Sequence, residues 1–201
     1  LEKMSKNVVE IIYINKINSK KTLDILKKRK ITLGLSIGCR SIFKEKIINY
    51  FQGNLFNIHD GLLPKERGGG LNTWRVLLGT KSIGSTLHKI EKGIDSGKIL
   101  YQQSISIKKK KDLYPIDIMK LLHEVEKKII LKFFKNLSNL NFLRKLKVQN
   151  NDRSEYFARL YSKVNGALDV DQSPKIFERN VRAFSDPYEG GWIELNKKKI
   201  F

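Results

Sequence analysis

The chain has 201 residues, of which 40% are hydrophobic and 9% aromatic, and this is enough for one substantial hydrophobic core. No apolar run approaches the roughly 20 residues that a membrane-spanning helix needs, and no signal-peptide pattern opens the chain, so we expect a cytoplasmic protein rather than a membrane protein. The single cysteine, Cys39, excludes a framework of internal disulfides.

The charge is strongly unbalanced, with 40 Lys and Arg against 20 Asp and Glu and a formal net charge of +20. Nucleic-acid binding is one interpretation, because basic surfaces attract phosphates. The lysines are spread along the chain, however, with only short runs at 108–111 and 197–199. This distribution favours a solvated surface over a nucleic-acid partner, and an anionic substrate such as a nucleotide suits either interpretation.

The first part of the chain has the pattern of a βαβ unit. Apolar residues predict strands at 8–14 and 31–37, with an amphipathic helix between them at 22–30. This order is typical of a parallel α/β sheet. A turn follows the second strand, and Ser41 is the predicted N-cap of a helix that ends near Phe51.

The residues of most chemical interest come next. Residues 55–59 read as a strand, and alternation along a strand places Asn57 and His59 on one face. Further along, Asp95 lies between glycines, which let a backbone bend closely around a site. A proton-accepting imidazole, a carboxylate to orient it and an amide donor for an oxyanion are the groups that acyl transfer needs.

Two neighbouring features have less specific patterns. The loop 60–70 contains three consecutive glycines with flanking cations, and it is either a phosphate cradle or a flexible connection. His88 is expected mainly to make a structural hydrogen bond, and His123 to be a solvated helix residue. Because the histidines and the one cysteine are scattered, we expect no metal site.

The remaining elements alternate between helices and strands. The longest predicted helix, 112–137, has an apolar stripe and carries Pro115 in its first turn, and the polar stretch 148–154 is interpreted as a linker. The other predictions are a helix at 73–78 capped by Asn72 and ended by Gly79, strands at 83–90 and 99–107, a helix at 173–184, and a strand-and-turn piece with its tip at 196–197.

Several of these motifs together resemble the folate-dependent formyltransferases. Asn57-x-His59 is followed by Leu62-Leu63-Pro64 and an Arg-Gly loop, and Asp95 lies 36 positions after His59, as in that family. The resemblance covers residues 30–105 well and the C-terminal segment more loosely.

The resemblance implies an α/β fold, in which a Rossmann-like, mainly parallel sheet is flanked by helices and followed by a small C-terminal α+β appendage. We therefore expect a catalytic domain at 1–147 and a C-terminal subdomain at 148–201. Family members normally have a strand, a glycine-containing loop and a βα unit upstream of what is here residue 8, so we expect the catalytic domain to be incomplete at its amino terminus.

The resemblance also implies a chemistry. N10-formyltetrahydrofolate would supply a formyl group to an amine, with Asn57 donating to the oxyanion, His59 taking the proton and Asp95 holding the imidazolium. For Arg40, a surface turn residue is the alternative to a role in binding. The implied folate-binding residues are Arg40, Ile42, Ile94 and Asp95.

The acceptor is predicted from the C-terminal run 183–190 and from Trp74, which resemble the nucleotide-sugar N-formyltransferases more than the methionyl-tRNA enzymes. We expect an amino sugar linked to dTDP or UDP, such as a 4-amino-4,6-dideoxyhexose for surface polysaccharide or O-antigen. Lys65 and Arg67 are the predicted cations for its diphosphate, and Asn72 and Trp74 would flank the sugar. A core position is the alternative for Trp74.

Other functions stay open at this point. They are a methionyl-tRNA formyltransferase, a non-catalytic remnant that binds folate or nucleotide, and a nucleic-acid-binding protein supported by charge alone. A homodimer is also left open.

Overall fold

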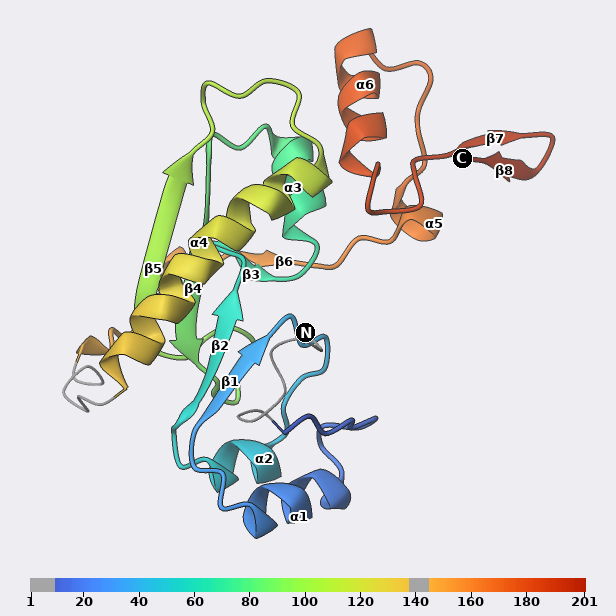
Figure 1. Ribbon diagram of the computed structural model, residues 1–201. Helices are drawn as coiled ribbons and strands as arrows, with labels where there is room; N and C mark the ends of the chain where they lie inside the picture. The colour runs from blue at the N-terminus through green and yellow to red at the C-terminus, as the bar shows by residue number, and fades with distance from the viewer. Residues whose placement is uncertain (1–9, 138–144) are drawn as a thin grey trace.

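The computed structural model describes residues 10–137 and 145–201, arranged around a four-stranded sheet (Figure 1). β1 and β2 pair in parallel, whereas β2 with β4 and β4 with β5 pair antiparallel. The strands, in their order across the sheet, are β1 (Gly34–Ile37), β2 (Leu55–His59), β4 (Ser82–Lys89) and β5 (Ile99–Ser106).

The expected α/β class, with a Rossmann-like sheet flanked by helices, is confirmed. The expectation of a mainly parallel sheet is wrong for the four-stranded sheet, because only one of its three pairings is parallel. The loop 90–98 joins β4 to β5 directly. It is shorter than the crossover of about a dozen residues that parallel neighbours require, so the chain turns back.

The predicted strand at 8–14 is wrong where the structure describes it. Residues 8–9 lie outside the described part of the chain, and residues 10–14 form no strand. Tyr13 there is 90% exposed. β1 ends the described sheet, so no neighbouring strand pairs with the backbone of residues 10–14, and local sequence preference alone does not make a strand.

The first two helices begin where polar side chains satisfy the backbone. α1 (Lys20–Lys28) is capped by Ser19, whose hydroxyl accepts from the Thr22 N–H. α2 (Glu45–Tyr50) begins after Lys44, so the predicted Ser41 cap is wrong. The Asn18 side chain accepts from Lys44 N at 2.8 Å and donates to Ile42 O at 2.8 Å, which holds this segment outside the helix.

α3 (Leu71–Leu78) ends at Gly79 as predicted, but it begins after Gly70, so Asn72 is not its cap. Gly70 has a φ of 69°, and the backbone of residues 159–160 comes within 3.2 Å of the position that a Cβ would occupy. Only glycine meets both conditions without strain.

α4 (Pro115–Asn136) is the longest described helix and crosses one face of the sheet (Figure 1). Pro115 lies in its first turn and His123 is exposed, both as predicted. The predicted apolar stripe is buried and packs against sheet residues such as Phe56 and Leu87. The buried stripe residues are Ile118, Leu122, Val125, Ile129 and Phe133.

The C-terminal part returns to the sheet region before it forms its own elements. β3 (Arg67–Gly68) pairs in parallel with β6 (Tyr156–Phe157), and Lys147 forms a backbone bridge with Ile99. The predicted linker 148–154 is therefore held on both sides, at one end by β5 and at the other by β3. The elements that complete the chain are η3 (Asn151–Arg153), α5 (Ser162–Asn165), α6 (Pro174–Ala183), β7 (Ile193–Leu195) and β8 (Lys198–Ile200).

α6 begins with Pro174 as predicted and packs on α3, where Ala183 and Phe184 join a buried cluster with Val76. β7 and β8 form the predicted hairpin with residues 196–197 at its tip. Within the described residues, no helix combines the length and the apolar character needed to cross a membrane.

Candidate active site

β2 and β4 bring the first two polar side chains together, because their register places Asn57 opposite His88. His88 Nδ1 lies 2.7 Å from Lys89 O, and since a carbonyl only accepts, Nδ1 carries the proton. His88 Nε2, 3.3 Å from Asn57 Nδ2, then accepts from the amide. This gives His88 the expected structural hydrogen bond and leaves the second amide proton of Asn57 for another acceptor.

Asp95, in the loop between β4 and β5, completes the cluster. Its carboxylate lies between two imidazoles, with Oδ2 3.6 Å from His59 Nδ1 and Oδ1 3.6 Å from His88 Nε2. The Gly68 N–H donates to Oδ2 at 3.0 Å. The structure thus brings together the three predicted catalytic residues, Asn57, His59 and Asp95, although their catalytic roles stay predictions.

His59 is buried, with an exposed fraction of 8%, and its Nε2 donates to Glu66 O. Burial lowers the pKa of His59 below its ordinary value, and the opposing effect of the Asp95 charge does not reverse this. His59 is therefore neutral near pH 7, with Nδ1 as the nitrogen that can take a proton beside Asp95.

Asp95 has the opposite protonation behaviour. Burial by itself would raise the pKa of Asp95, but the neighbouring His88 imidazole, the charge that His59 carries at low pH and the Gly68 N–H together lower it. The carboxylate stays ionised and can stabilise an imidazolium next to it.

The loop 60–70, interpreted above as a phosphate cradle or a flexible connection, is tied to α3 by an ion pair between Glu66 and Arg75. Glu66 Oε2 accepts from Leu62 N at 2.7 Å and from Arg75 Nη2 at 2.9 Å. Arg75 is 3% exposed and also donates to Asp60 O at 2.8 Å. The sequence analysis missed Arg75, because nothing in its position on the helix separates a buried arginine from a solvated one.

The four predicted sugar-phosphate residues are placed differently from one another. Lys65 is exposed. Arg67 Nη2 donates to Gln149 at 2.7 Å and to Asn151 at 2.9 Å, and Asn72 accepts from Arg75. Trp74 Nε1 donates to Ala158 O at 2.8 Å, and its ring lies 5.6 Å from that of Phe157. Three of the four thus make contacts within the chain.

The predicted folate residues lie in two loops. Arg40 and Ile42 follow β1, and Ile94 precedes Asp95. Arg40 is exposed, and the exposed fractions of Ile42 and Ile94 are 67% and 44%. Arg40 and Ile42 therefore lie beyond the edge at which the parallel strands β1 and β2 end, whereas Ile94 lies in the loop after β4, which runs antiparallel to β2.

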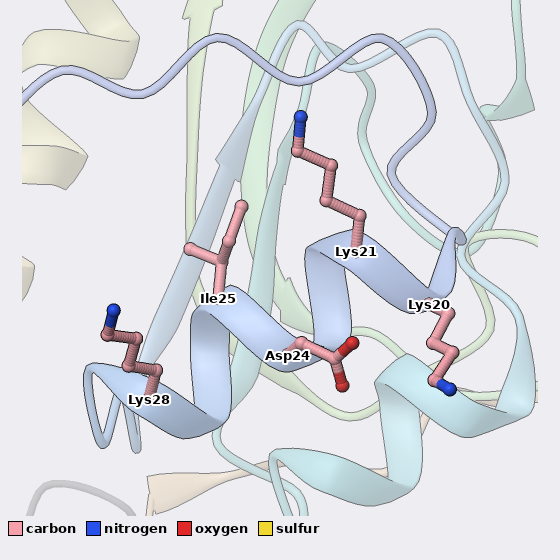
Figure 2. A pocket seen from close by; sticks show the side chains of 5 residues that line it. All are labelled: Lys20, Lys21, Asp24, Ile25 and Lys28. Carbon is pink, nitrogen blue, oxygen red and sulfur yellow. The ribbon is translucent and has the colours of Figure 1, made fainter.

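The hollow along α1 and the distribution of metal-binding side chains do not add a second site within the described residues. A shallow hollow along α1 is lined by Lys20, Lys21, Asp24, Ile25 and Lys28, and it contains none of the predicted site residues (Figure 2). The described residues contain no cluster of His, Cys, Asp or Glu able to hold a metal ion.

A Rossmann-like α/β sheet that presents an amide, a neutral imidazole and a carboxylate together defines an acyl-transfer class of protein. The family model for formyl transferases matches residues 11–133, and the chain belongs to this family. The predicted family membership is therefore confirmed.

The curated relatives include proteins of two kinds. The bifunctional polymyxin resistance protein ArnA of Wigglesworthia glossinidia brevipalpis is 32% identical over 202 residues, covering 99% of this chain and 30% of that protein. The methionyl-tRNA formyltransferase of Thermotoga maritima is 27% identical over 197 residues, covering 98% of this chain and 61% of that protein. The chain thus spans between about a third and three-fifths of the length of these curated relatives.

Among solved structures, an N-formyltransferase from Helicobacter canadensis superposes with a TM-score of 0.62 at 25% identity, covering 83% of this chain and 59% of that one. That protein was solved in complex with folinic acid and dTDP-3-aminofucose. The likeness supports the fold described above.

Proposed function

We propose that the protein transfers a formyl group from N10-formyltetrahydrofolate to the amine of a nucleotide-linked amino sugar, such as a dTDP- or UDP-linked amino-dideoxyhexose. The observation that carries this proposal is the convergence of Asn57, His59 and Asp95 in one cluster. The sequence likeness to ArnA, and the folinic acid and dTDP-aminosugar bound to a structural neighbour, support the donor and the acceptor class.

The chain's own groups suit each step of formyl transfer. The donor supplies an activated formyl carbon, which the neutral amine of the acceptor attacks. The free amide proton of Asn57 would donate to the formyl oxygen as it becomes negative, and the loss of one such donor costs about 3–4 kcal/mol in comparable sites. His59 Nδ1 would accept the proton of the attacking nitrogen, and Asp95 would stabilise the imidazolium. The tetrahedral centre would then collapse as the bond between the formyl carbon and N10 of the donor breaks, and the imidazolium would return its proton to N10, so that tetrahydrofolate leaves.

The surroundings also fit the two substrates. Ile42 and Ile94 offer exposed apolar surface for a flat ring system, and Arg40 is a cation available for an anionic group. Lys65 is an exposed cation in the loop that also carries Glu66, the partner of His59, so it is placed to neutralise part of a diphosphate.

The test supplies the purified chain with N10-formyltetrahydrofolate and a panel of nucleotide-linked 3-amino and 4-amino sugars, and detects formylated product by mass. Asn57→Ala, His59→Ala and Asp95→Ala should each lower kcat at least about a hundredfold. His123→Ala, which alters an exposed histidine on α4, is the matched control and should keep the unaltered rate. Donor binding without formylation of any amino sugar would instead indicate a non-catalytic folate-binding protein.

A methionyl-tRNA formyltransferase is the second candidate, favoured by the Thermotoga maritima relative and by the net charge of +20. Such an enzyme would formylate charged initiator tRNA, at rates that fall steeply as salt rises. Formylation of tRNA beside unreactive amino sugars would decide for this candidate.

A further inference from the structure

Gln149 is a buried polar side chain in the segment that follows the catalytic region. The residue is 6% exposed. Its Nε2 donates to Asp95 O at 2.8 Å and to Gly97 O at 2.7 Å. Its Oε1 accepts from Arg67 Nε at 3.2 Å and from Arg67 Nη2 at 2.7 Å.

These partners allow only one orientation of the Gln149 amide. A guanidinium only donates and a backbone carbonyl only accepts, so the oxygen must face Arg67 and the nitrogen must face the two carbonyls. Both amide protons and the amide oxygen are then used. A buried amide with all its hydrogen bonds made is fixed in place, and it fixes its partners in turn.

Both backbone segments that hold the Asp95 carboxylate meet at Gln149. Asp95 has a φ of 48°, a left-handed conformation that non-glycine residues rarely adopt, and Gln149 binds the carbonyls of Asp95 and Gly97. Arg67, which Gln149 also binds, directly precedes Gly68, whose N–H donates to Asp95 Oδ2.

We propose that Gln149 is a positioning residue, which fixes the Asp95 carboxylate between His59 and His88, so that the segment beyond residue 147 completes the active site. An effect on kcat rests on the proposed formyl transfer, whereas the position of the Asp95 carboxylate does not. A misplacement of about 1 Å in a catalytic group lowers turnover on the order of a hundredfold. Loss of the Gln149 hydrogen bonds should therefore lower kcat.

The experiment compares three variants of the full chain. Gln149→Met removes all four hydrogen bonds at similar length, and Gln149→Glu keeps an acceptor for Arg67 but cannot donate to the two carbonyls. Asn151→Ala is the matched control, because it removes one exposed partner of Arg67 and no contact with Asp95. The readouts are kcat and KM for formyl transfer and the pKa of His59 measured by NMR of the imidazole.

Both Gln149 variants should lower kcat by between about tenfold and a hundredfold, with little change in the KM of the acceptor. Gln149→Met, which adds no charge, should also lower the pKa of His59 further, because the nearby Asp95 charge raises it in the unaltered chain. Asn151→Ala should leave both quantities unchanged. If Gln149 has only a structural role, its replacement should lower the melting temperature without changing the pKa of His59.

The outcomes separate this proposal from the proposed function. If the unaltered chain transfers no formyl group, the function fails while the NMR titration still decides the role of Gln149. An unchanged His59 titration in folded Gln149→Met overturns the proposal. If that variant does not fold, Gln149→Leu, which also removes the four hydrogen bonds without adding a charge, decides in the same way, and failure of both to fold overturns positioning in favour of a structural role.

Discussion

Glu126 offers a test of the electrostatics beneath the active site. It lies half-buried on α4 beside Asp60, whose carboxylate also accepts from Ser85 Oγ at 2.8 Å. Burial, followed by the charge of Asp60 and a hydrogen bond with it, raises the pKa of Glu126 from 4.5 to about 8. Near pH 7 Glu126 is therefore protonated and donates to Asp60.

The sign and size of the effect follow from proton linkage. The folded protein holds this proton more tightly than the unfolded chain, so the free energy of unfolding falls as the pH rises from 4.5 towards about 8. Between pH 4.5 and pH 7 the unscreened loss would be about 3.4 kcal/mol. Solvent around a half-exposed pair reduces this to about 1–2 kcal/mol.

Glu126→Gln keeps a donor for Asp60 without requiring a bound proton. It should raise the free energy of unfolding by about 1–2 kcal/mol at pH 7 and by little at pH 4.5, measured by urea unfolding. Glu124→Gln, which alters an exposed carboxylate on the same helix, is the control and should have no such pH dependence. Equal stabilities of the Glu126→Gln and unaltered chains at pH 7, or a gain of the same size at both pH values, would refute the reasoning.

Three further predictions concern the site itself. Gly61→Ala should lower kcat about a hundredfold, because its Cβ would lie 2.4 Å from His59 Nε2. Gly69→Ala is the control and should keep the unaltered rate, because its Cβ would meet no atom closer than 3.4 Å. Equal steady-state rates of the two variants would contradict this prediction. Since burial lowers the pKa of His59, the acidic limb of the kcat–pH profile should lie below about pH 6.5, and a rate still rising above that pH would exclude His59 as the base. Lys65→Ala should raise the KM for a nucleotide sugar roughly fivefold with little change in kcat. Lys109→Ala, which alters another exposed lysine, is the control and should leave this KM unchanged. Equal KM values of the two variants would show that Lys65 does not bind the nucleotide sugar.

Features that depend on a repeating pattern of residues within one helix or strand were predicted well. Alternation along β2 predicted the shared face of Asn57 and His59, and a helical period predicted the buried stripe of α4. Both depend only on residues within one element. The stop at Gly79 and the start at Pro115 followed for the same reason, since each is a local backbone preference.

Features that depend on distant contacts were not predictable in this way. The sequence shows that Arg67 is a cation near the site, but not that Gln149, 82 positions away, binds its guanidinium. The strand expected at 8–14 failed at residues 10–14 for a related reason, because a strand needs a neighbour and no period in one segment reveals whether the neighbour exists. The cap predicted at Ser41 is absent because α2 begins later, after Lys44, whose N–H is bound by the Asn18 side chain from 26 positions away.

The contact between Gln149 and the Asp95 carbonyl also sets an order of events during synthesis. The two residues are 54 positions apart. At roughly 5–20 residues per second, a ribosome makes the Asp95 loop between about 3 and 11 seconds before the residue that secures it. The nascent chain therefore carries Asn57, His59 and Asp95 for several seconds without this support, and under the positioning role proposed above the Asp95 carboxylate is fixed only after residue 149 has been made.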